Sequence, residues 1–247
     1  DAAAAALLET ETFTQTRTYD ALNRVTSLIE PDLTELKPRY NQRGLLEKVE
    51  ARVRGSASWT TFVDHVEYDA KAQRQSITYG NGTATTYQYD DLTYRLKLLT
   101  TTRTSPSNTL QHLSYTSDAA GNIVQITDAA QQTLFYNNSV VLPQNLFEYD
   151  ALYRLTSATG REHASIGDVQ VDHNDVPLQN LPHNNDPSAV RTYLEEYSYD
   201  HVGNILEMFH EAAGTPVATW TRTYTYASGN NRLASNTIPG GTATYTH

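Results

Sequence analysis

The chain has 247 residues, of which 38% are hydrophobic, and it carries 18 Lys and Arg against 28 Asp and Glu, giving a formal net charge of −10. This acidic balance, without a basic cluster, argues against nucleic acid as a partner. No stretch approaches the ~20 apolar residues of a membrane-spanning helix, so we expect no membrane span. The chain has no cysteine, which excludes disulfides and cysteine metal sites.

Tyrosine dominates the aromatic residues, with 17 Tyr against five Phe and two Trp. Tyrosine suits strands whose rings are partly packed while their hydroxyls stay in water. The composition therefore favours an all-β chain, and its mean hydropathy of −0.55 predicts a thin core.

Residues 1–11 form an alanine-rich leader, which is too short to be a stable helix by itself but is compatible with a short helix. From Thr10 to Tyr19 the sequence is threonine-rich and alternating, which predicts a strand. We expect one β domain over residues 12–247.

A short phrase follows this first strand. In residues 19–25 (YDALNRV), Tyr19 ends the strand, Asp20 can accept hydrogen bonds from the backbone of its own turn, and Asn23 can take the left-handed conformation. A type I turn closed by a left-handed residue is a common hairpin connection. The phrase therefore predicts strand, turn, strand.

The phrase recurs along the chain. It is clearest at residues 149–155 (YDALYRL) and 199–205 (YDHVGNI), and looser copies begin at Tyr40, Tyr68, Tyr89, Tyr115 and Tyr226. Several copies follow one another after about 20 to 30 residues, the length of two strands and two turns, and such a period marks a repeat array. We expect turns at Ala21–Asn23, Asn41–Gly44, Gly80–Gly82, Asp118–Gly121, Asp200–Gly203 and Ser228–Asn231.

Some copies depart from the pattern. Ala72 and Tyr153 stand where Gly or Asn is expected, the copy at Tyr89 has one extra residue, and in the copy at Tyr115 the aspartate has moved to Asp118. We expect altered turns in these copies and a tolerant position at Tyr153.

Two stretches need separate interpretation. Residues 45–53 contain the Leu and Glu of a helix, but Val49, Ala51 and Val53 alternate with charged residues and predict a strand. Asn81-Gly82, between two β-rich runs, is a strong signal for a hairpin whose strands pair antiparallel.

Residues 160–196 interrupt the rhythm with proline, histidine and many Asn and Asp residues, which predicts a long polar excursion. His163, His173 and His183 lie ten residues apart, with Asp172 and Asp175 beside the middle one. A metal site can be imagined there, but ordinary solvated loop residues are the favoured interpretation. We assign no metal ligand.

The sequence contains no nucleophile elbow, phosphate-binding loop, zinc-protease motif or dinucleotide fingerprint. The repeated aspartates are interpreted as turn formers, because each stands directly before a turn. We therefore predict no enzyme activity, catalytic residue or cofactor. The repeat-defining turn residues are Tyr19, Asp20, Asn23, Tyr40, Asn41, Gly44, Tyr68, Asp69, Tyr89, Asp90, Asp118, Gly121, Tyr149, Asp150, Tyr199, Asp200 and Gly203.

The phrase, from about residue 16 to residue 238, resembles the YD repeat of the RHS family, which includes bacterial polymorphic toxins, insecticidal toxin complexes and teneurins. Residues 149–155 and 160–163 (GREH) look most like the large bacterial proteins. The resemblance implies tandem antiparallel hairpins forming a long, twisted, spiralling sheet, a segment of a β-cocoon wall. The family's self-cleavage region has no match here, so no catalytic residue is carried over.

By the same resemblance, the function is structural. The shell encloses a toxic C-terminal polypeptide until delivery, its partners are the remainder of the parent chain and this cargo, and the protein is secreted or at the cell surface. The alternative is a module that binds carbohydrate at cell surfaces. Exposed edge strands near Thr12–Tyr19 and Thr242–Tyr245 also predict edge-to-edge self-association.

Overall fold

The computed structural model describes residues 11–164, 188–213 and 219–246. Within these ranges the chain is almost entirely β-strand, and the described helical structure is one three-residue 3₁₀ turn, η1 (Val53–Gly55). The all-β, antiparallel fold predicted from the sequence is confirmed. Residues 1–10 of the predicted leader lie outside the described ranges.

The chain divides into two compact units, residues 1–92 with 99–110 and residues 93–98 with 111–247. The strands β8 (Leu96–Arg103) and β9 (Asn108–Ser117) contribute residues to both units.

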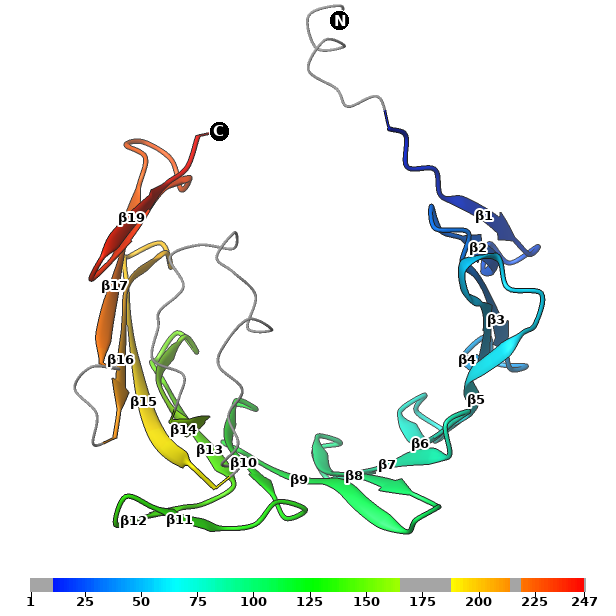
Figure 1. Cartoon of the computed structure of the whole chain (residues 1–247), viewed down its shortest axis with the longest axis horizontal. Coiled ribbons are helices and arrows are strands. Elements are labelled where there is room, and N and C mark those ends of the chain that lie inside the picture. Colours follow the sequence, from blue (N-terminus) through cyan, green and yellow to red (C-terminus); the bar gives the residue numbers. More distant parts are fainter. Residues whose placement is uncertain (1–10, 165–187, 214–218, 247) are drawn as a thin grey trace, which may run out of the picture. The chain divides into compact units, whose positions relative to one another are not determined.

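In the first unit, each strand pairs antiparallel with the next one along the chain (Figure 1). Residues 46–52 form a strand, so the preference for strand over helix in this stretch is confirmed. The strands are β1 (Thr16–Tyr19), β2 (Val25–Ile29), β3 (Glu35–Tyr40), β4 (Leu46–Arg52), β5 (Thr60–Tyr68), β6 (Arg74–Tyr79) and β7 (Thr83–Tyr89).

In the second unit, β10 (Ile123–Asp128) pairs antiparallel with β9 and with β13 (Gln144–Tyr149). From β13 onward, each strand pairs antiparallel with the next. These strands are β14 (Leu155–His163), β15 (Val190–Tyr199), β16 (Ile205–Ala212), β17 (Trp220–Tyr226), β18 (Leu233–Ile238) and β19 (Gly241–Thr244).

A separate hairpin of β11 (Leu134–Tyr136) and β12 (Ser139–Val141) also belongs to the second unit. Its two turn residues, Asn137 and Asn138, have φ of 48° and 61°. Two-residue turns that match the twist of a hairpin need positive φ at both positions. The sequence analysis did not predict this hairpin.

The boundaries predicted for the polar excursion are wrong. Strand β14 continues to His163 and β15 begins at Val190, so both ends of residues 160–196 are paired, with Gly160 opposite Tyr193 and Glu162 opposite Arg191. Residues such as Gly160 and Glu162 have low strand propensity, but pairing to a neighbouring strand overrides it. Residues 165–187 lie outside the described ranges.

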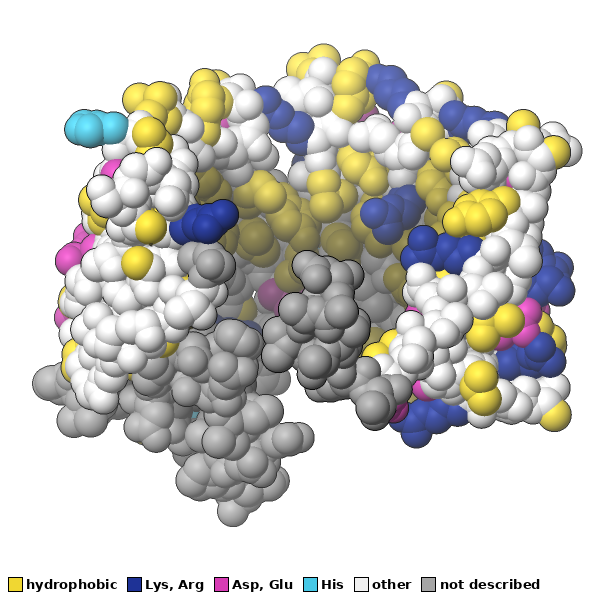
Figure 2. All heavy atoms as spheres, turned by 90° about the horizontal axis from the view of Figure 1, so that it is seen from above, with side chains coloured by type: hydrophobic (Ala, Val, Ile, Leu, Met, Phe, Trp, Pro, Cys, Tyr) yellow, Lys and Arg dark blue, Asp and Glu magenta, His cyan; other side chains and the backbone are white. Residues whose placement is uncertain are grey.

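The core of the described chain is thin, as predicted. Large apolar residues in repeat turns are exposed, with exposed fractions of 72% for Leu22, 67% for Leu152 and 69% for Val202, and hydrophobic side chains are visible at the surface in Figure 2. The stability of the strands therefore depends on pairing between neighbours. The buried hydrophobic residues are Ala51, Val66, Ile77, Val141, Ala158, Ala189, Ala212 and Ile238.

Candidate functional site

The repeat turns share one hydrogen-bonding pattern. In the first copy, Asp20 Oδ1 accepts from the backbone N–H of Leu22 at 2.9 Å and of Arg24 at 3.0 Å, and the backbone N–H of Asn23 donates to the Asp20 carbonyl at 3.0 Å. One carboxylate oxygen thus satisfies two backbone donors of its own turn. The same pair of bonds forms at Asn41, Asp69, Asp150 and Asp200.

The fourth residue of each turn, counted from the aspartate, has a positive φ. The angle is 60° at Asn23, 79° at Gly44, 111° at Gly121 and 98° at Gly203, as the sequence predicts. In the copy at Tyr89, the left-handed residue is Tyr94, with φ of 59°, one place later than usual. The extra residue therefore alters that turn, as expected.

The expectation of altered turns at Ala72 and Tyr153 is wrong. Their φ values are 65° and 62°, and their N–H groups donate to the carbonyls of Asp69 and Asp150, as in the other copies. The hydrogen bonds to the aspartate hold the turn even where the side chain disfavours the left-handed region. Tyr153 thus shares the left-handed backbone of the glycines in other copies, and its tolerance of substitution stays a prediction.

The interpretation of the copy at Tyr115 is also wrong. Asp118 accepts from the N–H of Gly121 at 2.7 Å and of Asn122 at 2.9 Å, and Ser117 is opposite Ile123 in the ladder. This copy therefore keeps the common frame over residues 117–123, with Ser117 in the tyrosine position, and its aspartate has not moved.

In six repeats, the tyrosine connects its repeat to the one before it. Tyr199, for example, donates its hydroxyl hydrogen to the carbonyl of Leu155, the first residue after the preceding repeat turn, at 2.7 Å. Tyr40, Tyr68, Tyr89, Tyr149 and Tyr226 do the same, and the six oxygen–oxygen distances lie between 2.7 and 3.1 Å. We call this series the tyrosine ladder.

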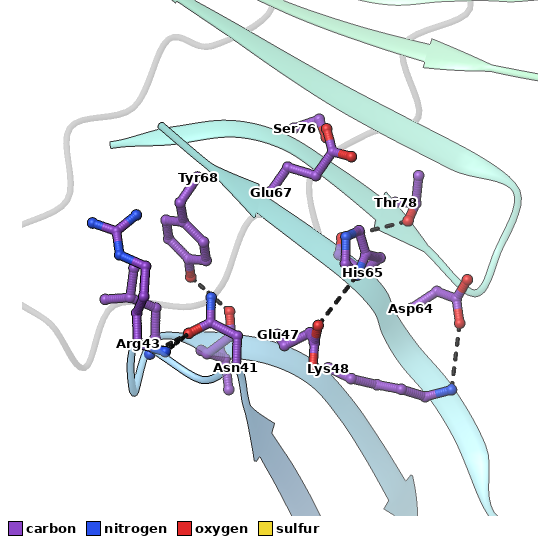
Figure 3. Close-up of polar contacts among 12 residues, drawn as sticks. Asn41, Arg43, Glu47, Lys48, Asp64, His65, Glu67, Tyr68, Ser76 and Thr78 are labelled. Carbon is purple, nitrogen blue, oxygen red and sulfur yellow. Dashed lines mark hydrogen bonds and ion pairs between the residues drawn. The ribbon is translucent and has the colours of Figure 1, made fainter. Parts of the chain in front are cut away.

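An arginine next to the left-handed position reaches forward to the next turn, either just before that position, as at Arg43, or just after it, as at Arg95. Arg43 donates to the carbonyls of Asp69 at 2.7 Å and Ala70 at 3.0 Å, and Figure 3 shows its turn beside Asn41 and Tyr68. Arg95 reaches the Asp118 and Ala119 carbonyls in the same way. The sequence analysis did not predict these contacts.

Arg154 contacts its own turn, the next turn and a tyrosine of the ladder. Its guanidinium pairs with Asp150 at 2.7 Å, donates to the Asp200 carbonyl at 3.0 Å and lies 4.8 Å from the centre of the Tyr199 ring. Arg24 pairs with Asp20 and lies over Tyr40 at the same distance. Arg154 thus joins its own turn, the next turn and the tyrosine ladder, and Arg24 joins its own turn to the ladder.

The turn carboxylates are stabilised in their charged form. The backbone hydrogen bond from Arg24 is the largest cause that lowers the pKa of Asp20, and that from Arg154 lowers the pKa of Asp150. For Asp118 the main cause is the Asn122 side chain. At Asp200, desolvation raises the pKa, but hydrogen bonds from Asn204, Val202 and Gly203 outweigh it and the net shift is downward.

The ladder tyrosines shift in the opposite sense. Burial raises the pKa of Tyr89, Tyr199 and Tyr226 above the ordinary value, because it disfavours the phenolate. The phenols therefore stay protonated, and able to donate, throughout the neutral pH range.

These residues are suited to structure rather than to catalysis. Both oxygens of Asp20 and Asp150 accept hydrogen bonds from their own repeat, which explains their place before each turn. Of the histidines considered for metal binding, His163 ends β14, whereas His173 and His183, with Asp172 and Asp175, lie outside the described residues. No group of three potential ligands converges within the described ranges.

The chain is similar in structure to parts of solved toxin complexes. It matches the crystal structure of TcdB2-TccC3-Cdc42 with a TM-score of 0.71 at 29% identity, over 93% of this chain and 10% of that one. It matches a mutant Tc holotoxin pore of Photorhabdus luminescens with a TM-score of 0.68 at 29% identity, over 90% of this chain and 10% of that one.

Two curated relatives come from Yersinia entomophaga. Toxin subunit YenC2 is 33% identical over 221 residues, which are 85% of this chain and 22% of that subunit. Toxin subunit YenC1 is 32% identical over 238 residues, 94% of this chain and 23% of that subunit. The chain thus spans less than a quarter of the length of either relative. No family model matches the sequence.

The tyrosine–aspartate turns recur through both units, and the sequence and the fold agree with the same group of toxin subunits. These similarities are consistent with the RHS, or YD-repeat, toxin family that the sequence resembles.

Proposed function

We propose that this chain is a wall segment of a shell that encloses a toxic C-terminal polypeptide of its parent protein until delivery. The observation that carries the proposal is the tyrosine ladder, in which six repeats each donate a hydrogen bond to the repeat before them. Such neighbour-to-neighbour support extends a sheet by adding repeats, without any site chemistry. The similarity to toxin subunits supports this role.

We also propose that this segment has no enzyme activity, because its recurring polar residues form hydrogen bonds within the turns and between the repeats. A hydrolase screen of the chain tests this part, with His163→Ala as a control for the histidine that ends β14. Activity that this substitution removes would contradict a purely structural role.

Protection of the C-terminal polypeptide tests the shell itself. The full-length parent protein is treated with protease, and the C-terminal polypeptide is followed by immunoblot. We expect slow cleavage in the wild type and faster cleavage when Tyr68, Tyr149 and Tyr199 are all changed to Phe, because each change removes one connection between repeats. Tyr153→Phe, at an exposed turn ring, is the matched control. Equal cleavage of the enclosed and the isolated polypeptide would refute the proposal.

Under this proposal the parent protein is a secreted toxin. A location at the cell surface stays a prediction. No helix in the described ranges is long and apolar enough to span a membrane. The carbohydrate-binding alternative also stays a prediction, and a glycan array with the intact chain tests it.

Self-association through an edge strand is the remaining part of the proposal. β1 pairs with β2 over four residues, and all four residues of β1 are exposed. An exposed strand edge can recruit another strand. Analytical ultracentrifugation should show a size that rises with concentration and falls again with Thr18→Lys, and a concentration-independent monomer would count against this part.

A further inference from the structure

His210, on β16, lies between two carboxylates. Its side chain is 8% exposed, its Nε2 is 3.3 Å from Oε2 of Glu162 on β14, and its Nδ1 is 3.3 Å from Oε1 of Glu195 on β15. A neutral imidazole has one N–H and can donate to one of them, with a lone pair facing the other. A protonated imidazole donates to both.

Two aromatic rings fix the orientation of the imidazole. The Tyr193 ring is stacked at a centroid distance of 5.4 Å, and the Trp220 ring of β17 is stacked at 5.0 Å with planes 11° apart. The faces of these rings are electron-rich and favour a cation between them. The imidazole therefore has fixed partners in its plane and above and below it.

The charged side chains paired around this ring carry a net negative charge, which one proton on the imidazole can neutralise. Arg191, which is 5% exposed, pairs with Glu162 at 2.6 Å, and the Tyr197 hydroxyl donates to Glu195 at 2.7 Å. The directly paired group of Glu162, Glu195 and Arg191 carries two negative charges and one positive charge, and buried charge is costly unless it is balanced. Protonation of His210 balances it. On β17, the further cation Arg222 lies over the Trp220 ring at 5.6 Å.

The position of the cluster in the sheet gives it a role. β14 ends at His163 and β15 begins at Val190, so the connection between these paired strands is much longer in sequence than a repeat turn, and closing a longer connection costs more chain entropy. Glu162 is opposite Arg191 and Glu195 is opposite His210, so the cluster joins β14, β15 and β16.

We propose that His210 is a proton-operated clasp, which fastens β14 and β15 to β16 when its imidazole is protonated and loosens them when the proton leaves. By linkage, the clasp stabilises the fold at the acidic end of the histidine titration range, and that stabilisation declines as the pH rises.

The test is thermal unfolding of the whole chain at about pH 5.5 and about pH 8, the interval over which histidine changes charge. We expect the wild type to melt several degrees lower at the higher pH, and His210→Gln to remove most of this difference. Hydrogen exchange should show that the pH-dependent loss of protection in the wild type is concentrated in β14, β15 and β16.

His65→Gln is the matched control, because His65 lies 3.9 Å from the carboxylate of Glu47 but is 49% exposed. This variant should keep the wild-type pH dependence. If His210→Gln does not fold, Glu195→Gln serves instead, since it removes one of the two charges while its amide oxygen can still accept from Tyr197, and it should reduce the difference. A pH dependence that is unchanged in these cluster variants would overturn the proposal.

Discussion

Tyr153 and Gly203 occupy the same place in their repeat turns, with φ of 62° and 98°. A side chain in the left-handed region costs about 1–2 kcal/mol, which glycine avoids. We therefore expect Gly203→Val to lower the free energy of unfolding by more than about 1 kcal/mol and Tyr153→Gly to raise it by up to about 1 kcal/mol. Chemical denaturation measures both changes. Equal effects of the two substitutions would mean that backbone conformation does not control these turns.

The turn aspartates set how stability depends on acid. The folded-state pKa values of Asp20, Asp118, Asp150 and Asp200 are lowered. Their contribution to stability is therefore fully present above the unfolded value, about 3.9, and is lost as the pH falls through the folded values. Melting temperatures should fall below about pH 4, and Asp150→Asn should make that decline shallower. If the melting temperature of Asp150→Asn declined as steeply as that of the wild type, carboxylates other than Asp150 would be responsible for the acid dependence.

At the scale of the element, the turn between β6 and β7 contains two glycines with different roles. A Cβ at Gly80 would lie 1.8 Å from the backbone oxygen of Thr61, whereas a Cβ at Gly82 meets no atom within 4 Å and only the positive φ of 79° disfavours it. Gly80→Ala must displace the backbone of β5, so we expect a loss at or above the usual ~1–3 kcal/mol of overpacking. Gly82→Ala should cost about 1 kcal/mol. Urea denaturation of both variants measures the difference, and the reverse order would contradict it.

The tyrosine ladder predicts a smaller and more regular effect. Tyr68 donates to the Leu46 carbonyl at 2.7 Å, and removing this hydroxyl should cost about 0.5–1.5 kcal/mol, the net value of one hydrogen bond. Tyr68→Phe keeps the ring, so its loss measures the hydrogen bond alone. Tyr153→Phe, on an exposed turn, should be neutral. Equal losses in the two denaturation curves would show that the ladder bond contributes nothing.

Sequence analysis predicted the turns whose hydrogen bonds join residues that are close together in the sequence. Asp200 and Gly203 define a turn through bonds within five residues, and Asn81-Gly82 does the same. The frame of the copy at Asp118 was missed because its tyrosine position holds Ser117. The pairing of Glu162 with Arg191, and their contact with His210, has no local signal because these residues are far apart in the sequence.

At the scale of the molecule, the repeats imply that the stability of each strand depends mainly on its own repeat and on the neighbouring repeats. In repeat arrays, stability is approximately a sum of the repeats and their interfaces with neighbours, so a weakened connection opens nearby strands first. Two arginines allow a matched test, because each reaches from its own turn to the next one. Arg43 donates to carbonyls at Asp69 and Ala70 in the first unit, and Arg154 donates to Asp200 in the second.

Hydrogen exchange measured by mass spectrometry should separate the two variants. With Arg43→Ala we expect faster exchange in β3 to β6 and unchanged exchange in β15 to β18, because the lost bonds join repeats of the first unit. With Arg154→Ala we expect the reverse, with faster exchange in β13 to β16 and unchanged exchange in β3 to β6. Each variant thus serves as the control for the other. If both variants accelerated exchange equally in all strands, the chain would unfold as one cooperative body, and the neighbour-to-neighbour account of its stability would be wrong.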